Sequence, residues 1–334
     1  MAGRDVQTVA AIGCGVIGAG WAARWRCAGV AVRVADPSPE VASIVADTTD
    51  RALAAWSDLG IAPSADGVGD LTIHSSIEEA VAGADLVHES VPERLDLKTE
   101  TLTTIDAAAS PDAVVASSTS GFRPTELARS LERPERFLVA HPFNPVYLMP
   151  LVEVVAGEGT HLDIVERAEH AFTSIGMRTL RVRREIDAFI ADRLLEAVWR
   201  EALWLVHDGV ATTAEIDEAI VHGVGLRWAQ MGLFETYRTA GGAAGMRHFL
   251  AQFGPALQWP WTKLTDVPEW TDELVGTIAS QSDDQSGHRT IDELLADRDR
   301  NLVALLSALE QLDAGRGVAA GATLATFRRS RHVN

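Results

Sequence analysis

A short glycine-rich segment near the start of the chain constrains the fold more than any other feature. The apolar run TVAAI (8–12) stops at GCGVIGAG (13–20), and the residues that follow, WAARWRCAG, have the spacing of a helix. Gly13, Gly15 and Gly18 are therefore predicted to form a tight turn between a buried strand and a helix. Such a turn lets the backbone approach a ligand closely, and the helix N-terminus offers unpaired N–H groups to an anion.

An acidic residue follows this turn at the distance expected of a dinucleotide-binding fold. Asp36 ends the next strand-like run, VAVRVAD (30–36), and lies 23 residues after Gly13, close to the roughly 20 residues of the dinucleotide fingerprint. Its carboxylate would bind the adenosine ribose and repel a 2′-phosphate, which favours NAD over NADP. The alternative is a tight turn that binds no ligand. The predicted cofactor contacts are Gly13, Cys14, Gly15, Val16, Ile17, Gly18 and Asp36.

Strand-like runs alternate with Ala- and Leu-rich helical segments through the first half of the chain. After the second strand, these runs lie at 84–91, 113–119, 136–142 and 178–183. This alternation predicts a mostly parallel sheet covered on both faces. Beyond it, the apolar spacing changes to three or four residues, which is typical of helices. We predict an α/β fold with an N-terminal Rossmann-type dinucleotide-binding domain at 1–186 and an all-α C-terminal domain at 187–334.

The composition disfavours several kinds of partner. The chain has 29 Lys and Arg against 47 Asp and Glu, a formal net charge of −18, and such a chain repels nucleic acid and anionic membrane surfaces. Cys14 and Cys27 are the only cysteines, and they fit neither a metal-ligand spacing nor a disulfide framework. No basic leader precedes the first strand, and no apolar run has membrane-spanning length. We expect a cytoplasmic protein without a metal, whose partner is a small molecule.

A carboxylate, Glu153, stands within the apolar run HPFNPVYLMPLVEVV (141–155). A buried carboxylate without a partner is costly, so Glu153 either faces water or binds a partner, and His141 is the nearest candidate. Oxidation of an alcohol by hydride transfer requires a base for the hydroxyl proton, and histidine titrates in the right range. Glu153 could return on an adjoining strand, fix the tautomer of His141 and stabilise the imidazolium. The alternative is that His141 ends a strand and Glu153 faces solvent.

Six segments spread over nearly the whole chain carry a family resemblance. They are GCGVIGAG (13–20), ESVPERLDLK (89–98), SSTSG (117–121), HPFNPVYLMPLVEVV (141–155), AFIADRLL (188–195) and GLFETYRTAGG (232–242). In order and approximate spacing, this set resembles the 3-hydroxyacyl-CoA dehydrogenase superfamily. The resemblance implies an NAD-dependent dehydrogenase whose helical domain binds the substrate and forms a homodimer, for which the apolar stretch LLEAVWREALWLV (194–206) is suited.

The resemblance also implies roles for individual residues. His141 matches the family's catalytic base, Glu153 the acid paired with it, and Ser120 the serine that hydrogen-bonds the reacting oxygen. Without the resemblance, Ser120 could be an ordinary turn residue after a strand, and Lys98 a solvated charge on a helix. The positions that match the family's NAD site are Glu93, Lys98 and Asn144, the last of which we expect to shape the nicotinamide pocket.

Two departures from the family pattern bear on the substrate. Asp192 stands where the CoA enzymes usually carry asparagine, and an anion there would disfavour the enolate of an acyl thioester but could help to hold a cation. Alternatively, Asp192 and Arg193 are a plain charge pattern on a helix. Residues 37–93 contain a single Lys or Arg, Arg51, whereas recognition of the CoA phosphates ordinarily requires several. A CoA substrate is therefore not expected.

The segments NPVYLMPLVE and FGPALQWPWTKLTDVPEWTDELV are similar to those of family members that act on small 3-hydroxy acids. The resemblance implies oxidation of L-carnitine to 3-dehydrocarnitine by hydride transfer from C3. L-Gulonate or 3-hydroxybutyrate would use the same chemistry, and a crystallin-like or NAD-sensing protein without catalysis is a more distant alternative. Aromatic faces or a carboxylate would hold the trimethylammonium, although ordinary core packing is the alternative for each aromatic residue. The candidates are Phe143, Tyr147, Asp192, Trp228, Phe234, Trp259 and Trp261 for the cation, and Arg193, Arg247 and Lys263 for the carboxylate.

Overall fold

The computed structural model describes two units of the chain. The sheet unit comprises 1–190, 299–310 and 323–334, and the helical unit comprises 191–298 and 311–322. The residues described within them are 6–65, 67–240, 249–251, 269, 271–274, 276–277, 280, 288, 290–312 and 320–332. Four candidates for substrate contact lie outside the described residues, namely Arg247, Trp259, Trp261 and Lys263.

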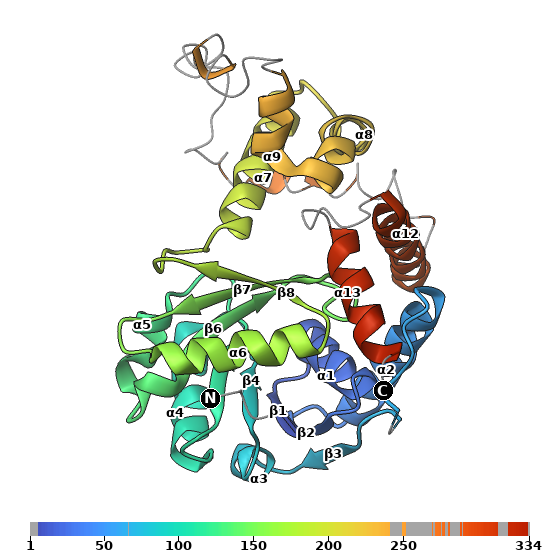
Figure 1. Cartoon of the computed structure of the whole chain (residues 1–334). Coiled ribbons are helices and arrows are strands. Elements are labelled where there is room, and N and C mark those ends of the chain that lie inside the picture. Colours follow the sequence, from blue (N-terminus) through green and yellow to red (C-terminus); the bar gives the residue numbers. More distant parts are fainter. Residues whose placement is uncertain are drawn as a thin grey trace. The chain divides into compact units, whose positions relative to one another are not determined.

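The sheet unit is built on one eight-stranded sheet with the strand order β3-β2-β1-β4-β5-β6-β7-β8 (Figure 1). Neighbouring strands are parallel except β6 and β7, which are antiparallel. The strand order reverses between β1 and β4, which is where folds of this type bind dinucleotides. This confirms the predicted α/β, Rossmann-type class. The strands are β1 Thr8–Ile12, β2 Ala31–Ala35, β3 Leu71–His74, β4 Leu86–Glu89, β5 Val114–Ser117, β6 Phe137–Pro142, β7 Leu151–Ala156 and β8 Arg178–Val182.

Helices cover both faces of this sheet because successive side chains of a strand point to opposite faces. On β4, Val87 belongs to a buried cluster with Leu102 and Ile105 of α4, whereas His88 packs on Trp21 of α1 and Phe172 of α6. Parallel central strands buried on both faces explain why these runs are apolar without alternation. The helices are α1 Val16–Cys27, α2 Val41–Asp58, α3 Ile77–Val81, α4 Leu95–Ala108, α5 Pro124–Leu127 and α6 Leu162–Ser174, with short 3-10 turns η1 Ala128–Ser130 and η2 Pro134–Arg136.

The last helix of the chain, α13 (Ala320–His332), also packs on the sheet unit. Phe327 meets Trp56 of α2 edge to face, with ring centroids 5.2 Å apart, and both side chains are buried. Sequence analysis placed everything after residue 186 in one helical domain, whereas contacts group 299–310 and 323–334 with the sheet. Burial of Phe327 against α2 is the physical reason for this grouping. The predicted boundary itself stays a prediction.

Within its described residues, the helical unit consists of helices and the segments that connect them, as predicted. Gly232, with φ 70°, interrupts the helical geometry of α9. In the part of the chain that the structure describes, no helix has both the length and the apolar character needed to cross a membrane. The helices are α7 Ala191–His207, α8 Thr213–Ala219, the π-helix η3 Ile220–Val224 and α9 Gly225–Ala240, and α12 Ile291–Leu312 crosses the division between the units.

A fully buried histidine, His88, lies in an aromatic cluster beneath the sheet. Its ring stacks on Trp21 with centroids 4.1 Å apart, and its Nε2 accepts a hydrogen bond from Trp25 Nε1 at 3.0 Å. Phe172 lies 5.8 Å away, and the His88 Nδ1 has no hydrogen-bond partner among the described residues. Burial lowers the pKa of His88 to about 3. The imidazole is therefore neutral throughout the range in which an ordinary histidine becomes protonated.

This burial predicts a pH dependence of stability. In the unfolded chain His88 binds a proton below about pH 6.5, but in the folded protein it does not until about pH 3, so acidification favours unfolding. Between neutral pH and about pH 5, we expect His88 to cost about 2 kcal/mol of the free energy of unfolding. Urea unfolding of the wild type and of His88→Phe at both pH values measures this. An equal acid-induced loss in the two proteins would contradict the prediction.

Candidate cofactor and catalytic site

The glycine turn joins β1 to α1 with almost no space between them. A Cβ on Gly18 would lie 1.8 Å from the carbonyl oxygen of Gly13, and Gly13 itself has φ +80° and lies against the backbone of Ser90 and Val91. A Cβ on Gly15, by contrast, would meet nothing within 4 Å. Gly13 and Gly18 are thus required by packing, whereas Gly15 leaves open space at the N-terminus of α1.

Asp36 follows the end of β2 and connects two backbone segments. Its Oδ2 accepts a hydrogen bond from the Cys14 N–H at 2.6 Å, and its Oδ1 accepts one from the Ser38 N–H at 2.8 Å. The Cys14 side chain is buried, and burial, with a smaller contribution from Asp36, raises the pKa of its thiol to about 12. Cys14 is therefore a packing residue of the turn, and its thiol remains protonated at neutral pH.

A cavity of about 920 Å³ opens at the carboxyl ends of β1, β2, β4 and β5. It brings together most of the residues predicted to bind the cofactor, but Gly18 and Asn144 are not part of its wall. Ser90, Ser118 and Ile77 line it as well, and sequence analysis did not identify them. Their positions next to the ends of strands were the available signal. The predicted residues in its wall are Gly13, Cys14, Gly15, Val16, Ile17, Asp36, Glu93, Lys98 and Ser120.

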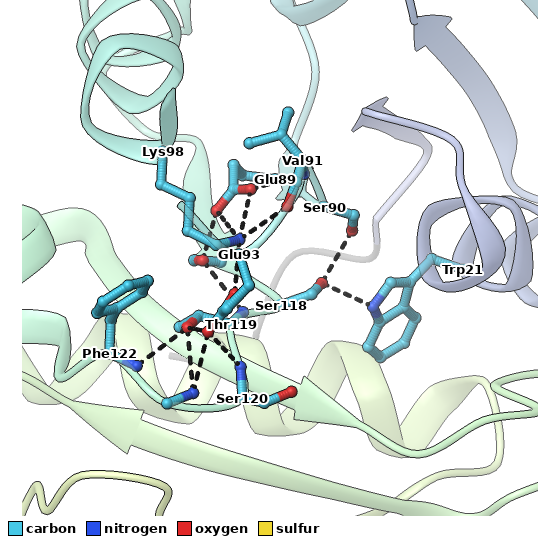
Figure 2. A network of polar contacts seen from close by, with 12 residues as sticks. Trp21, Glu89, Ser90, Val91, Glu93, Lys98, Ser118, Thr119, Ser120 and Phe122 are labelled. Carbon is cyan, nitrogen blue, oxygen red and sulfur yellow. Dashed lines mark hydrogen bonds and ion pairs between the residues drawn. The ribbon is translucent and has the colours of Figure 1, made fainter. Parts of the chain in front are cut away.

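Lys98 is buried and paired with acids, which excludes the alternative of a solvated helix charge. Its Nζ lies 3.0 Å from Glu89 Oε1 and 3.3 Å from Glu93 Oε2, and it donates to the Val91 carbonyl at 3.0 Å (Figure 2). Glu89 also accepts from the Ser117 hydroxyl at 2.5 Å. Burial raises the pKa of Glu89, while Lys98 and the hydrogen bonds oppose that shift. Glu89, which sequence analysis missed, is thus the buried counter-charge of Lys98.

His141 and Glu153 are paired across the antiparallel strands β6 and β7. The strand register places the two residues opposite each other, and His141 Nδ1 lies 2.9 Å from Glu153 Oε2. Both side chains are buried, with exposed fractions of 4% and 0%. The other carboxylate oxygen of Glu153 accepts the N–H of Ile190 at 3.0 Å. Glu153 therefore does not face solvent, and it is held from two directions.

The chain just before α7 adopts an unusual conformation beside this pair. Ala188 and Phe189 both have positive φ angles, 56° and 49°, which residues with a side chain rarely adopt and which cluster at functional sites. The conformation places the Phe189 ring 5.6 Å from that of His141 and directs the Ile190 N–H to Glu153. This strained segment thus contributes to the orientation of the pair.

Phe143 and Tyr147, the two aromatic candidates in the segment after His141, lie in different environments. The Phe143 ring is partly buried and lies edge-on to His141 with centroids 4.7 Å apart. Asn144 is exposed and precedes a cis proline. Tyr147 is 5% exposed, and its hydroxyl donates to Asp299 Oδ2 at 2.5 Å. The geometry of Tyr147 favours the packing alternative, whereas Phe143 remains next to the histidine.

The remaining described candidates belong to the helical unit. Asp192 lies in the first turn of α7 and is partly buried, and Arg193 beside it is exposed. Trp228 and Phe234 of α9 are 38% and 74% exposed. Neither aromatic side chain is therefore committed to a core within its unit. Among the residues that the structure describes, no group of three His, Cys, Asp or Glu is arranged to hold a metal.

Comparison of the sequence with protein families identifies both parts of the chain. Residues 8–186 match the NAD binding domain of 3-hydroxyacyl-CoA dehydrogenase, and residues 189–271 match the C-terminal domain of the same enzyme. The chain belongs to the 3-hydroxyacyl-CoA dehydrogenase family. This confirms the family resemblance and NAD as the cofactor.

Several curated relatives of this family are similar over most of the chain. An L-carnitine dehydrogenase/betainyl-CoA thioesterase of Agrobacterium fabrum is 59% identical over 92% of this chain and 63% of its own length. L-carnitine dehydrogenases of Mesorhizobium japonicum and Pseudomonas putida are 53% and 50% identical, over 95% and 94% of this chain and 87% and 97% of their own. The chain spans less than two thirds of the Agrobacterium relative.

One solved structure has the same fold over most of this chain. It is an NAD⁺-dependent dismutase, 5-formyl-3-hydroxy-2-methylpyridine 4-carboxylic acid 5-dehydrogenase, with a TM-score of 0.79 and 32% identity. The match covers 91% of this chain and 99% of that one. The chain therefore shares its fold with a solved NAD⁺-dependent enzyme over nearly all of that enzyme's length.

The residues that line the cavity of the present protein fit an NAD molecule. The open face of Gly15 at the N-terminus of α1 offers a place for a pyrophosphate, which a Cβ there would narrow. Asp36 lies in the wall at the end of β2, where the ribose hydroxyls of the adenosine would bind. Apolar side chains such as Ile44 and Ile77 line the wall near it. These residues would hold the adenosine half, and the β4 and β5 ends would face the other half.

The charge of Asp36 predicts the cofactor preference. We expect Asp36→Asn to lower the ratio of kcat/KM for NAD to that for NADP by roughly 10-fold, because repulsion of the 2′-phosphate is removed. The single amide oxygen of asparagine keeps an acceptor for one of the two N–H groups of Cys14 and Ser38. Because a loosened turn would lower activity with both cofactors, the ratio between them reports the charge. Asp70→Asn, at an exposed acid outside the cavity, is the matched control. Equal use of NAD and NADP by the wild type would contradict the assignment.

Proposed function

We propose that this protein oxidises L-carnitine to 3-dehydrocarnitine with NAD, by hydride transfer from C3 of the substrate. The observation that carries the proposal is the identity of 50–59% to relatives named L-carnitine dehydrogenase, over more than nine tenths of this chain. The buried His141–Glu153 pair and the cofactor cavity supply the groups that this chemistry requires. We propose that the protein is cytoplasmic and acts as a homodimer, for which α7 offers exposed Leu194, Leu195 and Trp199.

The proposed base is His141. Its Nδ1 is bound to Glu153, which fixes the orientation of the ring, and Nε2 is proposed to take the hydroxyl proton of the substrate. As the ring becomes an imidazolium, the carboxylate of Glu153 stabilises the new charge, and the Ile190 N–H keeps that carboxylate in place. NAD, when bound, accepts the hydride that leaves carbon as the proton leaves oxygen. Burial of the pair excludes water from its hydrogen bond.

Ser120 is the proposed donor to the reacting oxygen. It lies in the wall of the cavity at the end of the turn that follows β5. A hydroxyl there would donate to the oxygen of the substrate and keep C3 near the cofactor, so it would act on position rather than on proton transfer. Glu93, Lys98 and Asn144 are proposed to complete the cofactor site.

The trimethylammonium of L-carnitine needs an aromatic face or a carboxylate because it cannot donate ordinary hydrogen bonds. Phe143 is the preferred candidate, since its ring lies beside His141. Tyr147 is a weaker candidate because its hydroxyl is bound to Asp299. Asp192 is proposed to add negative charge, and Arg193 to pair with the carboxylate. Another small 3-hydroxy acid, such as L-gulonate or 3-hydroxybutyrate, is the second candidate substrate.

The base assignment predicts a specific loss of the chemical step. We expect His141→Ala to lower kcat for L-carnitine oxidation by on the order of 10²- to 10⁴-fold, the usual contribution of a general base. NAD affinity should stay near the wild-type value, because the histidine contacts the proton and not the adenosine. Glu153→Gln should also be slow, since the imidazolium loses its counter-charge. His161→Ala, at an exposed histidine, is the control. Near-normal turnover by His141→Ala would refute the assignment.

The substrate assignment predicts discrimination by the cationic group. We expect 3-hydroxybutyrate, which lacks that group, and L-gulonate to be far poorer substrates than L-carnitine in kcat/KM. Phe143→Ala should weaken L-carnitine binding by roughly 0.5–2 kcal/mol, the range of a cation–π contact, and should affect 3-hydroxybutyrate much less. Steady-state kinetics with saturating NAD measures both. If either competitor were used as efficiently as L-carnitine, the substrate would have to be reassigned while the dehydrogenase chemistry stood.

A further inference from the structure

The backbone around Ser120 is held by an unusual concentration of hydrogen bonds. Oε1 of Glu93 accepts the Thr119 hydroxyl at 2.5 Å, the Ser120 N–H at 3.2 Å and the Gly121 N–H at 3.1 Å (Figure 2). The Thr119 hydroxyl also accepts the N–H of Phe122 at 3.1 Å. Three successive residues of the turn thus bind one carboxylate oxygen, which comes from a different strand-to-helix connection.

The second oxygen of Glu93 is fixed as well. Its Oε2 lies 3.3 Å from Lys98 Nζ, and the same ammonium binds Glu89 at 3.0 Å. Glu89 in turn accepts the Ser117 hydroxyl, and that hydroxyl accepts the Thr119 N–H at 3.3 Å. Both ends of the segment 117–121 are therefore tied to carboxylates that share one buried ammonium. Hydrogen bonds to charged groups are roughly twice as strong as neutral ones, so the arrangement is stiff.

The side chain of Ser120 takes no part in this network. Among the described residues none hydrogen-bonds its hydroxyl, although its N–H is bound, and the residue is exposed to the cavity. The network therefore fixes the backbone and leaves the hydroxyl available to a ligand. A carboxylate that served only to contact a cofactor would not need all three donors of the turn on one oxygen.

We propose that Glu93 is a positioning residue for Ser120: its carboxylate, anchored by Lys98, holds the 119–121 turn so that the Ser120 hydroxyl reaches the reacting oxygen. This deepens the proposed function and rests on it for the role of Ser120. Glu93 is half-exposed in the cavity wall, so it can also contact the cofactor. The distinguishing consequence is that part of its effect passes through Ser120, because small displacements of a positioned group reduce rates steeply.

Kinetics at saturating NAD and L-carnitine tests whether Glu93 acts through Ser120 or only through the cofactor. Glu93→Ala should lower kcat by roughly 10- to 100-fold, the scale of an ångström-sized misplacement. Glu93→Gln, whose amide oxygen can still accept the same donors, should recover part of the loss. Asp96→Asn, at an exposed acid that pairs with Arg94, is the matched control and should leave kcat unchanged.

A double-mutant cycle assigns the effect to Ser120. In a Ser120→Ala background, the Glu93→Ala substitution should lower kcat by less than about 3-fold, because the group that it positions is gone. If Glu93→Ala lowers kcat equally in both backgrounds, or changes only the KM for NAD, Glu93 acts on the cofactor alone and the proposal is overturned. Should Glu93→Ala fail to fold, the same cycle is run with Glu93→Gln.

An activity-independent measurement separates this inference from the proposed function. In hydrogen exchange, a peptide spanning 117–122 should exchange faster in Glu93→Ala than in Asp96→Asn, because the Ser120 and Gly121 N–H groups lose their acceptor. Unchanged exchange overturns the proposal whatever the turnover. If the wild type fails to oxidise L-carnitine while the exchange difference is present, the substrate assignment fails but the hold on the turn stands.

Discussion

The close approach of α1 to the end of β1 is the constraint on which the rest of the site depends. At Gly18 a Cβ would lie 1.8 Å from the carbonyl oxygen of Gly13, so the helix can sit there only without a side chain. The approach directs the N–H groups of the helix N-terminus at the cavity. The same approach buries Trp21 of α1 against the sheet. The indole N–H of Trp21 donates to the Ser118 hydroxyl in the cavity wall at 3.1 Å. The turn thus fixes the cavity wall next to the ends of two strands, β1 and β5.

One turn further along α1, a buried guanidinium connects the helix to the segment that follows His141. Arg24 donates to the carbonyl oxygens of Val146, Ile175 and Gly176 at 2.9, 3.1 and 2.8 Å. Burial lowers the pKa of Arg24 to about 9, so it is still charged at neutral pH, and carbonyl dipoles replace a counter-ion. Because Val146 lies in the segment after His141, the helix that opens the cofactor site also anchors the chain leaving β6.

The features that could be predicted from the sequence are those set by neighbours along the chain. The glycine turn, Asp36 and the alternation of strands and helices depend on local spacing, and the fold class followed from them. The distance between His141 and Glu153 suited a return strand, and antiparallel pairing supplied the register. Glu89 and Ser118 were missed because the pairing of β4 with β5 places Glu89 opposite Ser117 and lets the Ser118 N–H donate to the Glu89 carbonyl, and local spacing does not determine that register. The hydrogen bond of Tyr147 could not be predicted for a related reason, since its partner Asp299 comes from α12.

The carboxylates at this edge of the sheet explain how so acidic a chain builds an anion-binding site. Each carboxylate accepts backbone N–H groups from another segment of the chain or from a turn. These hydrogen bonds connect the segments and largely compensate the negative charge of the carboxylate. The N-terminus of α1 remains for the pyrophosphate, while the surrounding acids disfavour further phosphates such as those of NADP or CoA. The trimethylammonium of the proposed substrate meets no such repulsion, whereas its carboxylate needs a cation such as the proposed Arg193. The carboxylates and the residues whose N–H groups they accept are Asp36 with Cys14 and Ser38, Glu89 with Val91, Glu93 with Ser120 and Gly121, and Glu153 with Ile190.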